Sequence, residues 1–233
     1  MINSHILKSS FFIEMNVPPD TKAEISPGVS PDKTTGLRRV PTQRRSQERV
    51  ERILEIATRC IVEKGLDAVR MSEIAELSEV SIGSLYQYFP DKASIVMTLA
   101  ERYNKEGRDC VEAELNAVNS EQELLEAMRR IVDGYYEMFL TEPMMQAIWQ
   151  ATQGDKSLQE IDTEDCNVHK SMLLDALVRL RPTQEKTALV PLAALVMQFI
   201  GTTVRLAISV DRKQGDKIIE LFKKMLVNNL LNS

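Results

Sequence analysis

Residues 74–89 read Ile-Ala-Glu-Leu-Ser-Glu-Val-Ser-Ile-Gly-Ser-Leu-Tyr-Gln-Tyr-Phe. Two short helices that cross steeply around a three- or four-residue turn need a small residue where they meet and an apolar residue at the corner. Ala75 and Val80 supply these two residues. Ser81 is expected to cap the second helix by accepting a hydrogen bond from the backbone N–H of Ser84. The stretch therefore predicts a helix-turn-helix with helices near 71–78 and 81–88.

The second of these helices has an inward and an outward side. Leu85 and Tyr88 are three residues apart and are expected to face inward. The side chains left to face outward are Ile82, Gly83, Ser84, Tyr86 and Gln87. Small residues allow close approach to a groove wall, Gln87 can bond the edge of adenine, and the Tyr86 hydroxyl can reach a phosphate. The free N–H groups at the start of the helix also favour phosphate.

A longer helix is predicted upstream, from Ser46 to a glycine cap at Gly65. Its apolar side chains recur at helical spacing, at Val50, Ile53, Leu54, Ala57 and Ile61. The chain is acidic overall, with a net charge of −5, yet residues 38–49 contain five arginines and one glutamate. Positive charge gathered in one short arm favours a nucleic-acid partner, although an ordinary solvated charge run would look the same.

These features resemble the TetR family of transcriptional regulators. Its signature of a long helix followed by "IA…GVS.GTLY.YF..K" is matched over about residues 46–95 by Ile74, Ala75, Val80, Ser81, Gly83, Ser84, Leu85, Tyr86, Tyr88, Phe89 and Lys92. The resemblance implies phosphate contacts from Tyr86 and Lys92, base contacts from residues 82–84 and Gln87, and an arm before the first helix that reaches the backbone or the minor groove. The predicted DNA-binding residues are Arg44, Arg45, Ser72, Ser81, Ile82, Gly83, Ser84, Tyr86, Gln87, Tyr88 and Lys92.

Two residues depart from the family pattern. Glu79 stands at the turn where a glycine is usual, so a residue with a side chain is expected to adopt a left-handed conformation close to DNA. Arg70 replaces the usual Thr or Ser cap of the preceding helix, and Ser72 is the candidate substitute cap. Both departures reduce the expected operator affinity more than they threaten the fold. The alternative is that the two short helices only pack and bind nothing.

The remainder of the chain is predicted to be helical, near 92–118, 121–140, 143–153, 157–180, 184–211 and 215–231. The expected fold is all-α. It comprises a disordered tail over 1–40 with a basic arm to about 45, a helix-turn-helix domain over 46–92, and a helical ligand-binding and dimerisation domain over 93–233. Met15 is an alternative start to Met1.

The last two predicted helices are apolar around most of their circumference. Such helices must be buried on two sides, and the second side is expected to be another subunit. The predicted dimer contacts are Leu192, Val196, Ile200, Val204, Phe222 and Met225. A thick monomeric core is the alternative. A dimer would place two recognition helices about 34 Å apart and would bind a palindromic double-stranded operator.

The middle helices carry the predicted effector-binding residues Tyr135, Met138, Phe139, Met145, Gln146, Trp149, His169 and Met172. The family resemblance implies an apolar effector among these helices, and methionine-rich walls adapt to irregular apolar ligands. For each of these side chains, a place in the ordinary core is the alternative. The favoured function is a repressor that leaves its operator when a small apolar or amphipathic effector binds. A regulator without a small-molecule effector, controlled by a protein partner or acting as an activator, is the alternative.

Other classes of function have weaker support. The three cysteines form no CxxC pair, which gives no disulfide framework or zinc site and favours the cytoplasm. Cys166 and His169 are one helical turn apart, so a helical enzyme is the alternative of another class, but they lack an orienting partner. We therefore expect no catalytic residue, metal or cofactor. The apolar run 188–204 is short and interrupted by polar residues, so no membrane partner is expected.

Overall fold

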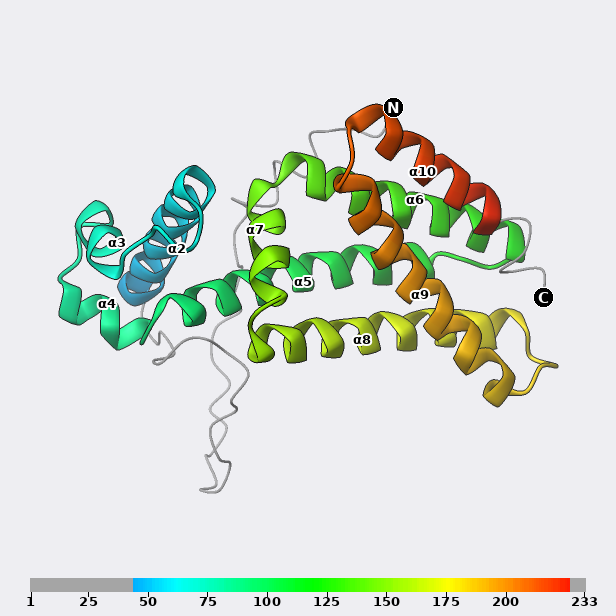
Figure 1. Ribbon diagram of the computed structural model, residues 1–233. Helices are drawn as coiled ribbons and strands as arrows, with labels where there is room; N and C mark the ends of the chain where they lie inside the picture. The colour runs from blue at the N-terminus through cyan, green and yellow to red at the C-terminus, as the bar shows by residue number, and fades with distance from the viewer. Residues whose placement is uncertain (1–43, 227–233) are drawn as a thin grey trace, which may run out of the picture. The chain divides into compact units, whose positions relative to one another are not determined.

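The computed structural model describes residues 44–226, which lie within one compact unit spanning residues 33–233. Over the described range the regular elements are all helices: α2 (Arg44–Lys64), α3 (Met71–Leu77), α4 (Ile82–Tyr88), α5 (Lys92–Asn116), α6 (Glu121–Thr141), α7 (Pro143–Thr152), α8 (Lys156–Leu180), α9 (Lys186–Ile208) and α10 (Arg212–Met225) (Figure 1). The predicted all-α fold is confirmed. The predictions for residues 1–40 and for the start codon concern residues outside the described range.

Helices α2, α3 and α4 form the predicted helix-turn-helix. Helix α2 buries the expected stripe of apolar side chains and ends at Gly65, whose positive φ of 80° is the predicted glycine cap. Ile74 and Ala75 of α3 are buried, as is Leu85 of α4. The small Ala75 side chain lets α3 and α4 approach closely, as the sequence predicted.

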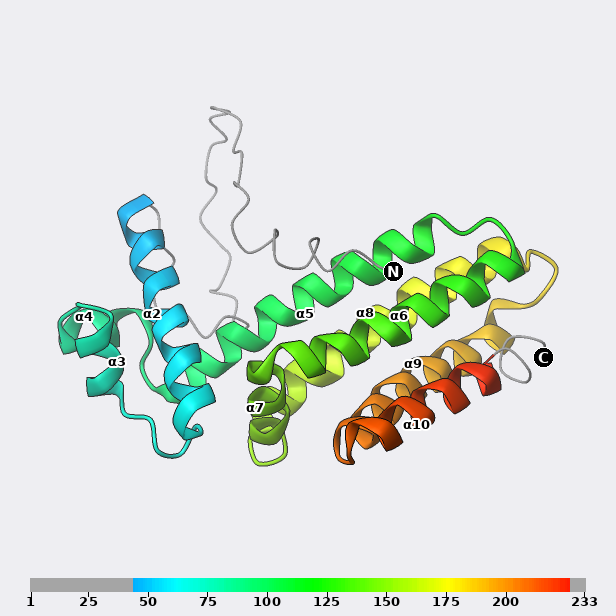
Figure 2. The same ribbon diagram turned by 90° about the horizontal axis from the view of Figure 1, so that it is seen from above.

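Helices α5 to α8 make the centre of the second helical group. The side chain of Asp91 caps α5 by accepting from the backbone N–H of Ser94, and Ser94 Oγ bonds back to Asp91. Helix α6 runs back along α5, and α8 packs along α5 (Figure 2). The side chains between these helices that are almost completely buried include Leu115, Leu124, Met128, Leu173 and Leu177. Burial of this apolar surface holds the group together.

The junction between α9 and α10 differs from the predicted helices over 184–211 and 215–231, in which the second helix starts at Gly215. Helix α9 ends at Ile208, and Asp211 caps α10 by accepting from the backbone N–H of Gln214. Gly215 lies inside α10, where an added Cβ would come 2.5 Å from the carbonyl oxygen of Ala207 and 2.5 Å from the hydroxyl of Tyr136. The glycine permits close helix contact and does not mark a helix end.

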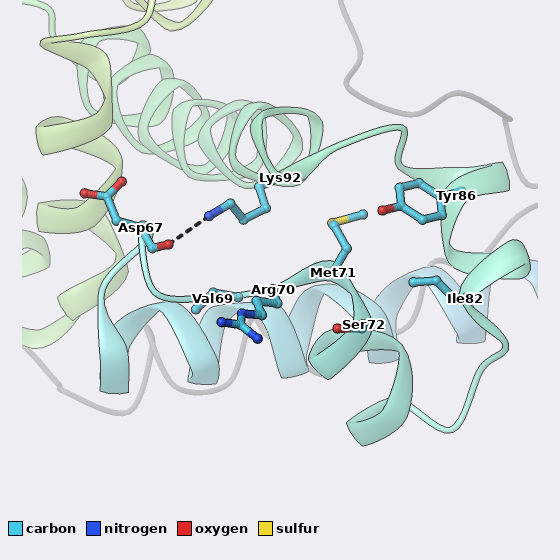
Figure 3. A pocket seen from close by; sticks show the side chains of 8 residues that line it. All are labelled: Asp67, Val69, Arg70, Met71, Ser72, Ile82, Tyr86 and Lys92. Carbon is cyan, nitrogen blue, oxygen red and sulfur yellow. Dashed lines mark hydrogen bonds between the residues drawn. The ribbon is translucent and has the colours of Figure 1, made fainter.

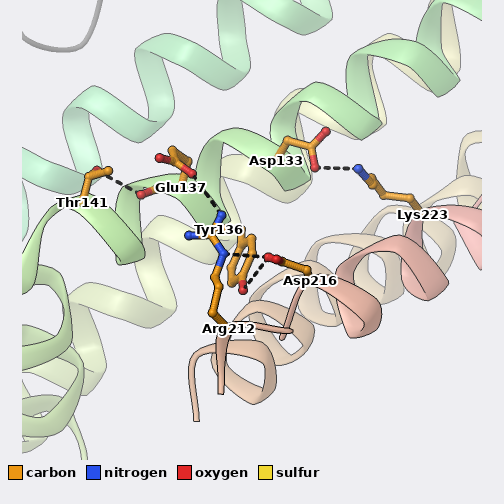
Figure 4. A network of polar contacts seen from close by, with 7 residues as sticks. All are labelled: Asp133, Tyr136, Glu137, Thr141, Arg212, Asp216 and Lys223. Atoms are coloured by element: carbon orange, nitrogen blue, oxygen red, sulfur yellow. Dashed lines mark hydrogen bonds and ion pairs between the residues drawn. The ribbon is translucent and has the colours of Figure 1, made fainter. Parts of the chain in front are cut away.

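A set of polar contacts also holds α10 against α6 (Figure 4). The Tyr136 hydroxyl donates to Asp216 Oδ1 at 3.2 Å, and the same oxygen accepts from Arg212 Nε at 2.8 Å. One helical turn before Tyr136, Asp133 accepts from Lys223 Nζ at 2.7 Å. These contacts fix where α10 lies on the surface of α6, because each joins the two helices directly or through Asp216.

The length of α9 corrects the expectation that its apolar run is too short to cross a membrane. It has 23 residues and a mean hydropathy of 1.7 over its most apolar window, enough to cross a membrane by length and composition alone. One face of α9 packs on α6, α8 and α10. A core helix of a globular protein passes the same test, so this is weak evidence for a membrane.

Candidate nucleic-acid interface

Helix α4, the candidate recognition helix, presents an accessible face. Its N-cap Ser81 accepts from the backbone N–H of Ser84 at 3.1 Å, as predicted. Ile82 and Tyr86, one turn apart, are 44% and 42% exposed. Gly83 and Gln87 are exposed and Ser84 is half-buried. The residues expected to face outward therefore form one open surface.

The opposite face of α4 is buried, and it includes Tyr88. Leu85 is completely buried and Tyr88 is 5% exposed. The Tyr88 hydroxyl lies 2.7 Å from Ser46 Oγ in the first turn of α2. The Tyr88 hydroxyl therefore holds α4 against α2 in this structure, and a DNA contact from Tyr88 stays a prediction.

The turn between α3 and α4 contains the strained residue that the sequence indicated. Glu79 has φ 55°, in the left-handed region. The backbone N–H of Val80 donates to the carbonyl of Ala75 at 3.0 Å and closes the turn. The Glu79 carboxylate lies 3.7 Å from the guanidinium of Arg52, and both side chains are exposed. The acidic group is partly neutralised by Arg52 but remains beside the recognition helix.

Lys92 does not project freely toward a DNA backbone. Its Nζ donates to the carbonyl oxygen of Leu66 at 2.8 Å, in the connection between α2 and α3. It also donates to the carbonyl oxygen of Asp67 at 3.2 Å (Figure 3). The ammonium group is thus used to hold that connection. The phosphate contact implied by the family resemblance stays a prediction.

Arg70 and Ser72 occupy the start of α3. Arg70 is the N-cap, with an extended backbone and no capping hydrogen bond from its side chain. Ser72 is exposed and does not act as the substitute cap, which corrects that expectation. The two residues line an open hollow beside α4 together with Asp67, Val69, Met71, Ile82, Tyr86 and Lys92 (Figure 3).

The two basic residues predicted to form an arm lie in the first turn of α2. Arg44 and Arg45 are both exposed and helical. Arg44 Nε donates to Glu48 Oε1 at 2.9 Å, one turn along the helix. An exposed pair of this kind is weak, so Arg44 remains available to a phosphate. The helix therefore begins earlier than expected.

The predicted effector residues are brought together on α6, α7 and α8. Phe139 and Met145 are buried, whereas Tyr135, Met138, Trp149 and Met172 are half-buried against the core. Tyr135 and Phe139 stack edge to face with ring centroids 5.1 Å apart. Gln146 is exposed, and its amide donates to the carbonyl of Phe139 at 3.2 Å. The effector role of Gln146 stays a prediction.

Several polar residues beside these side chains were missed in the sequence. The guanidinium of Arg205 lies 4.6 Å from the ring centroid of Trp149. Asp165 pairs with Arg108, and His169 Nδ1 lies 3.2 Å from Asp165 Oδ2. These groups come from α5, α7, α8 and α9, and only the tertiary fold brings such distant positions together. Their spacing along the chain gives no periodic signal.

Burial changes the acidity of two groups in this region. It raises the pKa of Tyr135 to about 12, although Arg205 opposes the change. Burial also raises the pKa of Asp162, again against the effect of Arg205. Both effects follow from the cost of placing a charge away from water. Polar groups with shifted pKa values in one place mark a candidate site.

Most of the predicted dimer contacts on α9 and α10 face the core of the chain itself. Val196, Ile200 and Val204 are buried within the chain, as is Phe222 of α10, so they are not available to a second copy. Leu192 is half-buried and Met225 is exposed. The exposed large apolar side chains of the two helices are Val190, Leu195, Phe199, Leu206, Leu221 and Met225. The predicted stripe of apolar side chains at helical spacing packs against the chain itself. The exposed side chains just named lie outside that stripe and are called the open face of α9 and α10.

Cys166 and His169 do not form a nucleophile and base pair in the described structure. Cys166 Sγ is 3.8 Å from Gln198 Oε1, and His169 Nδ1 faces Asp165. Burial raises the pKa of the Cys166 thiol, which opposes formation of the reactive thiolate. This geometry counts against the enzyme alternative.

Comparison with known proteins agrees with this arrangement. A family profile described as "Bacterial regulatory proteins, tetR family" matches residues 53–98, and one described as "Tetracyclin repressor-like, C-terminal domain" matches residues 122–233. Together the two matches cover more than half of the chain. The chain belongs to the TetR family of transcriptional regulators.

Individual relatives match over different lengths. The HTH-type transcriptional repressor KstR of Mycolicibacterium smegmatis is 42% identical over 57 residues, which is 24% of this chain and 28% of KstR. The match thus spans little more than a quarter of that relative. A TetR-family regulator from Streptomyces coelicolor has a TM-score of 0.58 at 24% identity, covering 79% of this chain and 98% of that one. A putative regulator from Saccharomonospora viridis in complex with choline has a TM-score of 0.57 at 18% identity, covering 79% and 98%. The structural likenesses establish the fold.

Proposed function

We propose that this chain is a sequence-specific DNA-binding repressor that acts as a homodimer on a palindromic operator. The observation that carries the proposal is the capped helix α4, whose Leu85 side is buried while Ile82, Gly83, Tyr86 and Gln87 are open. A helix presented in this way fits a major groove. The named relative KstR is a repressor, which supports repression over activation.

Selection of DNA fragments bound by the purified protein tests this proposal. A palindromic consensus is expected, with affinity that falls steeply as salt concentration rises. Gln87→Ala is expected to alter preference at one base pair in each half-site, with a loss of about 1–3 kcal/mol on the wild-type operator. Glu112→Ala, an exposed change on α5, is the control and should leave the consensus unchanged. Recovery of no enriched sequence would contradict the proposal.

The exposed apolar face of α9 and α10 supports dimerisation. Six large apolar side chains on two neighbouring helices remain uncovered within the described chain. Leu195, Phe199 and Leu206 share one side of α9 by helical spacing. Leu221 and Met225 are one turn apart on α10. Exposed apolar side chains gathered in this way commonly mark an interface. We propose that a second copy covers it, in preference to a membrane, because DNA recognition needs two recognition helices about 34 Å apart. A cytoplasmic location follows from this function.

A small apolar or amphipathic effector is proposed to bind near Tyr135, Phe139 and Trp149. The support is the mixture of aromatic walls and polar groups with shifted pKa values there, together with the choline complex of a protein that shares the fold. Residues 46–92 would then be the DNA-binding domain and 93–233 the effector and dimerisation domain. Helix α5 begins directly after α4 and packs on α8, so a shift of α5 would change the spacing of the recognition helices.

The effector proposal is tested with the intrinsic fluorescence of Trp149, the single tryptophan of the sequence. A metabolite panel is screened for fluorescence change, and positive compounds are tested for release of operator DNA. Compounds that change the fluorescence and release DNA support the proposal. A panel in which none does so favours the regulator without a small-molecule effector. No catalytic role is proposed for Cys166 or His169.

A further inference from the structure

The hollow beside α4 contains two basic side chains with different surroundings. Arg70 lies at the start of α3 and Lys92 at the start of α5 (Figure 3). Ile82 and Tyr86, from the exposed side of the recognition helix, line the same hollow. Whatever lies against α4 in a DNA complex therefore also lies beside Arg70 and Lys92.

Lys92 is already occupied by the protein. Two of its three N–H donors are directed to the carbonyls of Leu66 and Asp67, and the side chain is half-buried. These carbonyls belong to the connection that sets where α3 begins. Moving the ammonium group to a phosphate would leave both carbonyls without this donor.

Arg70 is in the opposite situation. Its side chain is exposed, and within residues 44–226 its guanidinium makes no hydrogen bond or ion pair. The hydroxyl groups of Ser72 and Tyr86 are likewise without a protein partner in that range. The nearby Glu73 is paired with Lys64. Three unoccupied donors, one of them permanently charged, therefore line a single hollow.

The position of this hollow suits the DNA backbone. A helix with its side chains is about 10–12 Å across, and the major groove is about 12 Å wide. When α4 occupies the groove, a side chain carried by the neighbouring α3 meets the wall of the groove, which is made of phosphates. The forked guanidinium of arginine matches phosphate oxygens with two parallel hydrogen bonds.

We propose that Arg70 binds a phosphate of the DNA backbone beside the groove that α4 enters, with the hydroxyl groups of Tyr86 and Ser72 as additional donors, and that Lys92 is a positioning residue that holds the α2–α3 connection. This inference rests on the proposed DNA-binding function. It reverses the expectation from the family resemblance, in which Arg70 reduced operator affinity and Lys92 contacted phosphate.

The test measures operator binding by fluorescence anisotropy over a series of salt concentrations, with the full-length protein. Loss of one phosphate contact reduces the slope of log K against log salt by about 0.9 per protomer, which is about eightfold in affinity per protomer at 0.1 M salt. Arg70→Gln is expected to show this reduction on operator and non-specific DNA alike. Arg70→Lys should keep the slope, because the charge remains. Arg129→Gln, which removes an exposed charge on α6, is the control and should leave the slope unchanged.

Lys92→Met separates the two roles. If Lys92 is a positioning residue, its replacement should lower both the melting temperature and the DNA affinity. The salt slope should stay at its wild-type value. An Arg70→Gln protein with wild-type slope and affinity would overturn the assignment, and so would a Lys92→Met protein that loses slope. Failure of the wild-type protein to bind any selected DNA would instead overturn the proposed function and this assignment with it.

Discussion

The hydroxyl groups of Ser46 and Tyr88 lie 2.7 Å apart and join the first turn of α2 to the last residue of α4. Tyr88 is 5% exposed, so this hydrogen bond is sheltered from water. The recognition helix is thereby held at its C-terminal end by a polar contact and along its length by buried Leu85. Its outward face is consequently fixed with respect to α2.

Replacement of Tyr88 by Phe should lower stability without removing a DNA contact. Loss of the hydrogen bond is expected to cost about 0.5–1.5 kcal/mol in the free energy of unfolding. Denaturant unfolding measures this change, and Ser46→Ala should produce a similar one. The affinity for operator DNA at fixed salt should fall no further for Tyr88→Phe than for Ser46→Ala, because both remove the same hydrogen bond. A larger loss for Tyr88→Phe would restore the direct phosphate contact that the buried hydroxyl argues against.

Two substitutions of Glu79 separate the effect of backbone strain on stability from the effect of charge. Glu79→Gly should relieve the left-handed conformation at φ 55°, with a net gain in stability of up to about 1 kcal/mol after the greater chain entropy of glycine is subtracted. Glu79→Gln removes only the charge and should leave stability nearly unchanged. Both should raise DNA affinity, because a negative charge near the phosphates is lost. Equal stability for the two variants would contradict the strain argument.

Gly215 should be intolerant of even a single added carbon. Gly215→Ala brings a Cβ to 2.5 Å from the carbonyl oxygen of Ala207, and the resulting shift of α10 is expected to cost about 1–3 kcal/mol. Gly134→Ala is the control, because its Cβ would meet nothing within 4 Å. That helical change should instead stabilise the protein by about 0.5–1 kcal/mol. Thermal melting of both variants checks the difference in sign.

The open face of α9 and α10 should control association. The double variant Leu206→Glu, Leu221→Glu changes side chains that are 54% and 61% exposed in the single chain, so its fold should remain intact. Charges placed in a dimer interface have no partner and should dissociate it. Light scattering is expected to give a dimer for the wild type and a monomer of 26.4 kDa for the variant. Val62→Glu, an equally simple change on exposed α2 surface, should remain dimeric; a dimeric double variant would place the interface elsewhere.

Alkaline pH should weaken the fold through its buried tyrosines. Burial raises the pKa of Tyr103 and of Tyr135 to about 12 from a model-peptide value of 10.0. The folded state therefore holds protons that the unfolded state releases, so stability is fully present below pH 10.0 and is lost as pH rises toward 12. Tyr135→Phe should flatten this decline in the free energy of unfolding. An unchanged pH slope would show that Tyr135 titrates normally.

Most helices and two of their caps were predictable because they depend on neighbours in sequence. Ser81 bonds to a backbone group three residues away, and Gly65 needs only its own positive φ. The outward face of α4 followed from the same local periodicity. By contrast, Gly215 looked like a helix end, since its close approach to Ala207 involves a different helix.

By itself, then, the amino-acid order determined the all-helical class, the helix-turn-helix and the open side of its second helix, because hydrogen bonds and apolar periodicity within a helix act over a few residues. Only the tertiary structure decided which apolar side of α9 is buried in the chain's own core and that Tyr88 and Lys92 contact Ser46 and the α2–α3 connection. It also decided that the Arg70 side chain has no hydrogen bond or ion pair within residues 44–226. These outcomes depend on which groups meet across the fold, and local spacing along the sequence does not specify those meetings.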